Sequence, residues 1–137
     1  MERTTRKILI VEDNKDWREA LALFLKRRGY EPVEAPTGAE ALEQALGVHP
    51  DLILMDLGLP GMTGDEVTAS LKANSQTRDI PVIVQTAFSS GLHTSRAIAA
   101  GAAEILYKPL KLTTLRDVLQ KYFPGDPEGT ETVPSQV

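Results

Sequence analysis

Four apolar runs in the sequence each stop at side chains that can do polar chemistry. The runs are Ile8–Val11, Leu52–Met55, Val82–Val84 and Ile105–Tyr107. The residues that follow them are Glu12 with Asp13, then Asp56, then Thr86, and finally Lys108 followed by Pro109. Because parallel strands bring their carboxyl ends to one edge of a sheet, and open α/β sheets bind ligands in a crevice there, we expect one polar cluster.

The expected cluster combines three carboxylates with a lysine and a hydroxyl. Glu12, Asp13 and Asp56 would repel one another at short range, which raises carboxyl pKa values unless a cation intervenes. A hard divalent ion resolves this repulsion, and Mg²⁺ typically binds one or two carboxylates together with waters and a phosphate. With Thr86 and Lys108 beside it, Asp56 becomes the candidate nucleophile for an incoming phosphoryl group.

The segments that would position this cluster alternate between strand-like and helix-like patterns. We expect strands at Lys7–Val11, Tyr30–Ala35, Leu52–Met55, Ile80–Thr86 and Glu104–Tyr107. Apolar residues at helical spacing predict a helix after each strand. The residues expected to face inward are Trp17, Ala20, Leu21, Phe24 and Leu25; Ala41, Leu42, Ala45 and Leu46; Val67 and Leu71; and Leu115, Val118, Leu119 and Tyr122. The fourth helix, around Leu92–Ala100, has a weaker, alanine-rich apolar face and is expected to be the least firmly anchored.

Local signals mark several helix ends. Thr37 with Glu40 and Thr63 with Glu66 have capping-box spacing, and Gly29 follows the first helix in the usual C-terminal position. Five successive strand–helix units imply right-handed crossovers and a parallel sheet with helices on both faces. The expected fold is therefore an α/β, flavodoxin-like doubly wound (βα)5 domain with strand order 2-1-3-4-5.

Composition and charge limit the possible partners. The 137 residues suit one domain, which we expect over 1–123, followed by a disordered tail or linker over 124–137 that is rich in Pro, Gly and acids. The net charge of -4 argues against direct nucleic-acid binding, which relies on Lys and Arg at phosphates. The sequence has no cysteine, which favours a reducing cytoplasmic setting, and no apolar stretch of membrane-spanning length.

The strand-end motifs together resemble the receiver domain of bacterial two-component response regulators, of the chemotaxis-regulator type. The resemblance covers about residues 7–123. The matching segments are Ile8–Asn14, Leu54–Gly64, Thr86-Ala87 and Lys108-Pro109. Each segment alone is a weak signal, but four segments in the right order, separated by the lengths of a five-unit βα fold, are specific.

The resemblance gives a role to each acidic residue of the expected cluster. It implies that Asp56 is the phosphoacceptor, and that Glu12 and Asp13 hold Mg²⁺ directly or through water. Asp56 and the carbonyl oxygen of Gly58 would be further metal ligands. The phosphoryl donor would be a phosphohistidine on a sensor histidine kinase or a phosphotransfer protein.

The resemblance also implies a switch that responds to phosphorylation. Thr86 and Lys108 would each pair with a phosphoryl oxygen, and the Lys108–Pro109 peptide bond would be cis. The switch and output residues would be Thr86, Ala87, Ile105, Tyr107 and Pro109. The output surface, formed by the helix near Leu92–Ala100, the strand Glu104–Tyr107 and the last helix, would contact an output protein or domain, or a second copy in a homodimer.

On this interpretation the chain is a phosphoacceptor signalling domain and not an enzyme, since it would catalyse only its own phosphorylation and dephosphorylation. The alternative is a protein-interaction module with a receiver fold that works without phosphorylation. An Asp56-dependent phosphoryl adduct would distinguish the two.

Two features depart from the family pattern. Ile105 stands three residues before the lysine, where the family usually carries Tyr or Phe. Tyr107 has the same strand parity, so the aromatic role has either moved to Tyr107 or vanished. Gly58 has no side chain to shield an acyl phosphate, whereas Phe88 would cover it, so their effects on phosphoryl lifetime oppose each other.

Other chemistries fit the first strand end poorly. A flavin-binding loop would have to cradle a phosphate, which Glu12 and Asp13 would repel. A dinucleotide-binding loop requires Gly-x-Gly-x-x-Gly, where this chain has Glu-Asp-Asn-Lys-Asp-Trp. A phosphatase of the haloacid dehalogenase type needs a second acid where Gly58 stands.

Taken singly, several of these residues also have ordinary structural interpretations. Asp13 or Asn14 would simply cap the first helix. His49 and His93 have no ligand-like neighbours in the sequence and are expected at the surface or in loops. Trp17 is expected to pack against the core rather than bind a ligand.

Overall fold

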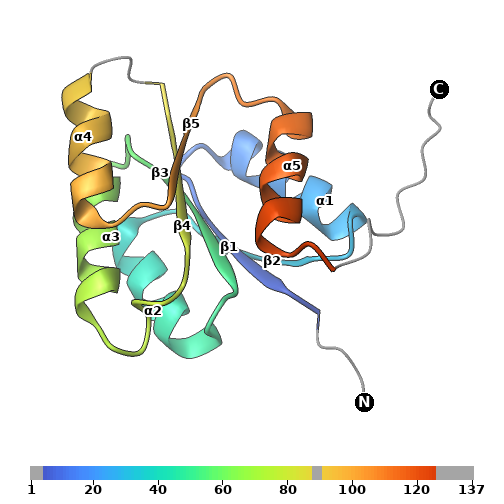
Figure 1. Cartoon of the computed structure of the whole chain (residues 1–137), viewed down its shortest axis with the longest axis horizontal. Helices are drawn as coiled ribbons and strands as arrows, with labels where there is room; N and C mark the ends of the chain where they lie inside the picture. Colours follow the sequence, from blue (N-terminus) through green and yellow to red (C-terminus); the bar gives the residue numbers. More distant parts are fainter. Residues whose placement is uncertain (1–4, 88–90, 126–137) are drawn as a thin grey trace.

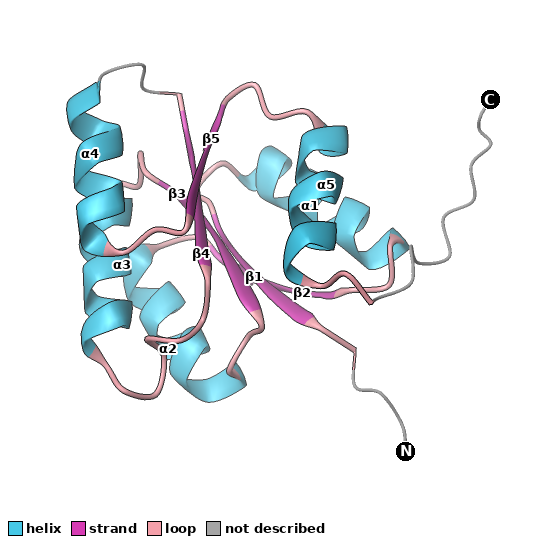
Figure 2. Cartoon of the chain, viewed as in Figure 1, coloured by secondary structure: helices cyan, strands magenta, loops and turns pink. Residues whose placement is uncertain are grey.

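Five parallel strands form one sheet in the order β2-β1-β3-β4-β5, which confirms the predicted topology. The computed structural model describes residues 5–87 and 91–125 (Figures 1 and 2). The strands are β1 (Lys7–Val11), β2 (Glu31–Ala35), β3 (Leu52–Asp56), β4 (Val82–Thr86) and β5 (Glu104–Tyr107). Central strands β3 and β4 are buried along their whole length, as expected where helices cover both faces.

Helices cover the two faces of the sheet unequally. They are α1 (Lys15–Arg27), α2 (Gly38–Val48), α3 (Gly64–Ala73), α4 (Gly91–Ala100) and α5 (Leu112–Tyr122). Figure 1 shows α1 and α5 on one face of the sheet and α2, α3 and α4 on the other. Among residues 5–87 and 91–125, no helix has the length and apolar character needed to cross a bilayer.

The alternation of side chains along each strand divides the core into two clusters. One face contributes Ile8, Ile10, Leu54 and Ile83, which pack with buried residues of α1 and α5. The other face contributes Leu9, Val11, Ile53, Met55 and Val84, which pack with α2, α3 and α4. A residue's parity along its strand therefore determines which layer of helices it meets.

The predicted helix starts carry the hydrogen bonds expected of caps. Trp17 N donates to Asn14 Oδ1 at 2.8 Å, so Asn14 is the residue that caps α1. Glu40 N donates to Thr37 Oγ1 at 3.1 Å, and Thr63 N donates to Glu66 Oε1 at 3.0 Å. These bonds satisfy backbone groups that a helix start leaves without an intrahelical partner.

Two residues predicted to face inward are exposed. Ala20 is exposed because the buried side of α1 is set by Leu21, Ala22 and Leu25. Leu46 is 41% exposed because α2 turns Ala45 toward the sheet, and the next residue lies about 100° further around the helix.

Strand boundaries also differ slightly from the prediction. Tyr30 precedes β2, and Ile80 precedes β4 as part of a turn in which its N–H donates to the Thr77 carbonyl. Asp56 is the last residue of β3 rather than the first residue after it. The predicted tail falls largely outside the described residues, which end at position 125, and Phe88 also lies outside them.

Helix α4 is held mainly by one small side chain. Ala97 is its buried residue, whereas Leu92 and Ile98 are 57% and 61% exposed. Large apolar side chains on a helix surface add little to its anchoring because they stay in contact with water. The face formed by α4 therefore carries unburied apolar area next to β5.

The start of α3 passes so close to the end of β3 that only glycine fits there. A Cβ atom on Gly64 would overlap the Asp56 carbonyl oxygen and approach Leu57 Cα to 2.8 Å. Gly64 N also donates to the Leu57 carbonyl at 3.3 Å. This contact fixes the loop that follows Asp56.

We expect Gly64→Ala to lower the free energy of unfolding by about 1 to 3 kcal/mol, because the backbone of β3 or α3 must move to admit the methyl group. The matched control is Gly47→Ala in α2, where an added Cβ meets nothing within 4 Å. Replacing that helical glycine is expected to stabilise the protein by up to about 1 kcal/mol. Urea unfolding measures both values, and equal effects at the two sites would contradict the close-packing argument.

Candidate functional site

The sheet brings the predicted polar residues together at the carboxyl ends of its strands. Glu12 follows β1, Asp56 and Thr86 are the last residues of β3 and β4, and Lys108 follows β5. Side chains two positions apart share a face of the sheet, so Glu12 and Asp56 lie on the face covered by α1 and α5. Four separate segments of the chain thus contribute to one edge.

Lys108 reaches across the sheet edge to the carboxylates of two other strands. Its Nζ lies 3.2 Å from Glu12 Oε1 and 3.4 Å from Asp56 Oδ1. Both carboxylates are buried, and the lysine is partly buried. Paired charges of this kind interact more strongly than exposed ones because solvent screens them less.

Three carboxylates converge beside this lysine. Glu12, Asp13 and Asp56 each offer an oxygen atom, and these atoms lie within 4.8 Å of one another. Glu12 and Asp56 are buried, whereas Asp13 is exposed and leaves the cluster open to solvent. A donor set made only of carboxylate oxygens fits a hard divalent cation such as Mg²⁺.

Backbone N–H groups hold the two buried carboxylates in place. Asn14 N donates to Glu12 Oε2 at 3.0 Å, and Gly58 N donates to Asp56 Oδ1 at 3.1 Å. Arg18 Nη1 donates to the Glu12 carbonyl at 2.9 Å and fixes the backbone of the same loop. Charge-assisted bonds of this kind orient the carboxylates before any ligand arrives.

Burial raises the pKa of the Glu12 carboxyl above its ordinary value, because desolvation disfavours the charged form. The hydrogen bond from Asn14 N and the charge of Lys108 lower this pKa, whereas the neighbouring Asp56 carboxylate raises it. The net direction is upward, with desolvation by burial as its largest cause and repulsion from Asp56 as a smaller one. A cation at this site would relieve the remaining repulsion.

The predicted switch residues lie next to the cluster on β4 and β5. Thr86 is buried and is the register partner of Tyr107, and Lys108 N donates to the Thr86 carbonyl at 2.8 Å. Tyr107 is 56% exposed, while Ile105 packs against the apolar core on the face of the sheet covered by α3 and α4.

The two remaining switch residues, Ala87 and Pro109, are exposed. The Lys108–Pro109 peptide bond is cis, as the family resemblance implies.

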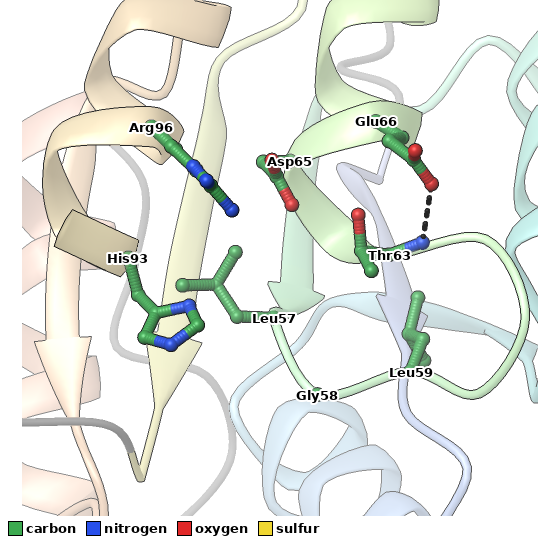
Figure 3. A pocket seen from close by; sticks show the side chains of 8 residues that line it. All are labelled: Leu57, Gly58, Leu59, Thr63, Asp65, Glu66, His93 and Arg96. Carbon is green, nitrogen blue, oxygen red and sulfur yellow. Dashed lines mark hydrogen bonds between the residues drawn. The ribbon is translucent and has the colours of Figure 1, made fainter. Parts of the chain in front are cut away.

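A cavity of about 360 Å³ opens between the loop after β3 and helix α4 (Figure 3). Leu57 and Gly58 line one side, and His93 and Arg96 line the other. Figure 3 shows Arg96 extending from α4 toward Asp65 of α3. Gly58 contributes only backbone to this wall of the cavity.

From the sequence, His93 is expected at the surface or in a loop, without ligand-like neighbours. The structure places it half-buried on the wall of this cavity, three residues before Arg96 on one side of α4. The spacing of His93 and Arg96 is the signal that was available, because residues three apart on a helix are neighbours.

Known proteins resemble this chain over most of its length. Residues 8–120 match the family model described as the response regulator receiver domain. The polar-differentiation response regulator DivK of Brucella ovis is 37% identical over 122 residues, which cover 89% of this chain and 98% of that protein.

Solved structures agree in fold and in sequence. The chemotaxis protein CheY4 of Vibrio cholerae matches with a TM-score of 0.82 and 32% identity, over 87% of this chain and 99% of that one. The receiver domain of the sensor histidine kinase PA1611 from Pseudomonas aeruginosa matches with a TM-score of 0.81 and 30% identity, over 89% of this chain and 100% of that one. That structure has a magnesium ion coordinated in its active-site cleft.

The raised pKa of Glu12 predicts a specific pH dependence of stability in metal-free buffer. A carboxyl that binds its proton more tightly in the folded state loses stability as the pH rises from the ordinary pKa of an unfolded-state carboxyl through the higher folded-state pKa. The stability of the wild type relative to Glu12→Gln should therefore fall as the pH rises through this window. Urea unfolding with EDTA between about pH 4 and 7 tests this, and a difference that rises with pH contradicts it.

Proposed function

The chain belongs to the response regulator receiver domain family of two-component signalling, and from that premise we propose that it accepts a phosphoryl group on Asp56. The donor is a phosphohistidine of a sensor histidine kinase or a phosphotransfer protein. Receiver domains are signalling domains rather than classical enzymes, so the product is the phosphorylated chain itself.

The observation that carries this proposal is the reach of Lys108 from the end of β5 to Asp56 and Glu12. A carboxylate held beside an ammonium group and two further acids is poorly suited to be a passive loop residue. It is suited to a reaction that brings a dianionic phosphoryl group to the same place, because Lys108 then pairs with the new charge.

In the proposed reaction a carboxylate oxygen of Asp56 attacks the phosphorus atom and forms an acyl phosphate. The bond from phosphorus to the donor imidazole nitrogen breaks, and the imidazole leaves with that electron pair. Lys108 and the Thr86 hydroxyl bind phosphoryl oxygens as the negative charge moves onto Asp56. Gly58 N, which already donates a hydrogen bond to Asp56 Oδ1, keeps the carboxylate oriented during the attack.

The donor set supports Mg²⁺ as the cofactor of this reaction. Glu12, Asp13, Asp56 and the Gly58 carbonyl oxygen would hold it. When bound, the ion supplies positive charge for the carboxylates and for the phosphoryl oxygens. Asp13 is the exposed member of the acidic cluster and would be the first to meet an ion that arrives from solvent.

The proposed output surface consists of α4, β5 and α5. Leu92, Ile98 and Tyr107 expose apolar area there, and Tyr107 is the register partner of the buried Thr86. A movement of Thr86 toward the phosphoryl group would change the packing around Tyr107. An output protein or domain, or a second copy of this chain, would bind the changed surface with a different affinity.

The test of the proposal is incubation with Mg²⁺ and acetyl phosphate followed by intact mass measurement. We expect one phosphoryl adduct on the wild type and none on Asp56→Asn. Lys108→Met should slow the uptake about 100-fold, because a preorganised cation is lost from the site of charge transfer. Lys111→Met, three residues away on an exposed side chain, should leave the rate unchanged.

The outcomes separate the two candidate functions. An adduct that forms equally on wild type and Asp56→Asn, or no adduct at all, would contradict phosphorylation at Asp56. The receiver-fold interaction module without phosphorylation would then be the better description of the chain.

A second prediction concerns the aromatic residue of the switch. We expect Tyr107→Ala to take up the phosphoryl group normally, because its side chain is 56% exposed and lies outside the acidic cluster. In the wild type, phosphorylation should slow hydrogen exchange in β5 as the ring becomes buried, and the alanine variant should lose this slowing. Tyr107→Phe keeps the ring and serves as the control. Equal slowing in all three proteins would show that Tyr107 has no coupling role.

A further inference from the structure

A fully buried amide lies beside Asp56 and is used by none of the family motifs. Gln85 is the next-to-last residue of β4, is 0% exposed, and is the register partner of Asp56 on β3. Buried polar side chains are normally hydrogen-bonded, and each exception needs a physical explanation. In β4, Gln85 follows the three aliphatic residues Val82, Ile83 and Val84.

Strand parity places Gln85 on the same face of the sheet as the acidic cluster. Gln85 is two residues after Ile83, and Asp56 is two residues after Leu54, and both aliphatic residues belong to the core under α1 and α5. Lys108 starts beyond β5 and reaches β3 and β1, so its side chain must pass over β4. Gln85 therefore belongs to the strand that separates Lys108 from Asp56 and lies on the same face of the sheet as both.

One end of the Gln85 amide is held by helix α1. Trp17 Nε1 donates to Gln85 Oε1 at 3.2 Å. Because the indole nitrogen is a donor only, this bond fixes which end of the amide is the oxygen. Trp17 N in turn donates to Asn14 Oδ1, and Asn14 N donates to Glu12 Oε2. A chain of hydrogen bonds thus runs from the acidic cluster through the start of α1 to β4.

The other end of the amide is a donor with no acceptor. Within the part of the chain that the structure describes, Gln85 Nε2 is buried and has no hydrogen-bond partner. A buried donor left without an acceptor costs about 1 to 3 kcal/mol. The neighbouring residue of the same face on β3 is Asp56, the place where the proposed function adds negative charge.

We propose that Gln85 is a positioning residue of the phosphoryl site. Trp17 orients the Gln85 amide so that Nε2 can donate a hydrogen bond to the negative charge that builds up at Asp56. This inference rests on the proposed function and adds to it a residue outside the family motifs. Trp17 acts through Gln85, so the first turn of α1 is linked to the state of the site. The link leads to the α1 face of the sheet, opposite the α4 side.

The test compares variants that remove each end of the link. Gln85→Met removes the amide at similar volume, and Trp17→Phe removes the indole N–H but keeps an aromatic ring. Each should slow phosphoryl uptake from acetyl phosphate by at least about tenfold, the loss expected of one hydrogen bond to a charged group. The double variant should be no slower than Gln85→Met alone, because Trp17 acts through Gln85.

The matched control is Ile83→Met, which changes a buried side chain on the same face of β4 one residue pair farther from the edge. It should alter stability toward urea without changing the uptake rate. If uptake by Gln85→Met and Trp17→Phe equals that of the wild type, the inference is wrong while the proposed function stands. If the wild type forms no Asp56 adduct, both are wrong.

A second readout does not depend on the reaction. Trp17 is the single tryptophan of the chain, so its emission reports the environment of this link. Mg²⁺ with beryllofluoride, a phosphoryl mimic, should shift the emission of the wild type. The shift should be absent from Gln85→Met even at concentrations where calorimetry shows that the mimic binds. An equal shift in both proteins would overturn the inference.

Discussion

The structure depends on the balance between two buried carboxylates and one lysine at the edge of the sheet. Glu12 and Asp56 come from the neighbouring strands β1 and β3, and Lys108 reaches them from the end of β5, two strands from β3 and three from β1. Burial raises the pKa of the Glu12 carboxyl, and the neighbouring Asp56 carboxylate raises it further, while Lys108 lowers it. The fold therefore holds two carboxylates and an ammonium group in fixed positions before any ligand binds, which is electrostatic preorganisation.

The strand order and the main site residues were predictable because they follow from one geometric rule. Parallel strands with helical connections place their carboxyl ends at one edge, so residues such as Asp56 and Lys108, 52 positions apart in sequence, must meet there. The rotation of individual helices was less predictable. Ala20 and Leu46 fit the apolar spacing but lie at the margin of their stripes, and only packing against the sheet decides which margin is buried.

Gln85 and His93 were not predicted, for two different physical reasons. Gln85 interrupts an apolar strand and looks like a strand end, and only the register with β3 places it beside Asp56. His93 gains its neighbours from the approach of α4 to the loop after β3, which no local pattern specifies. Contacts between strands or between helices are not specified by a single sequence, even when each element is identified correctly.

Strand parity explains how one modification can reach both layers of helices. Glu12, Asp56, Gln85 and Lys108 belong to the face under α1 and α5, whereas Thr86 and Tyr107 have the parity of the face under α3 and α4. Within a strand, side chains of opposite parity are kept apart by the sheet itself. At its carboxyl edge this separation ends, so under the proposed function a phosphoryl group on Asp56 would be within reach of groups from both faces. Helix α4 buries one residue, Ala97, whereas α1 and α5 bury three each, and a helix with few buried apolar contacts is the one expected to open most easily.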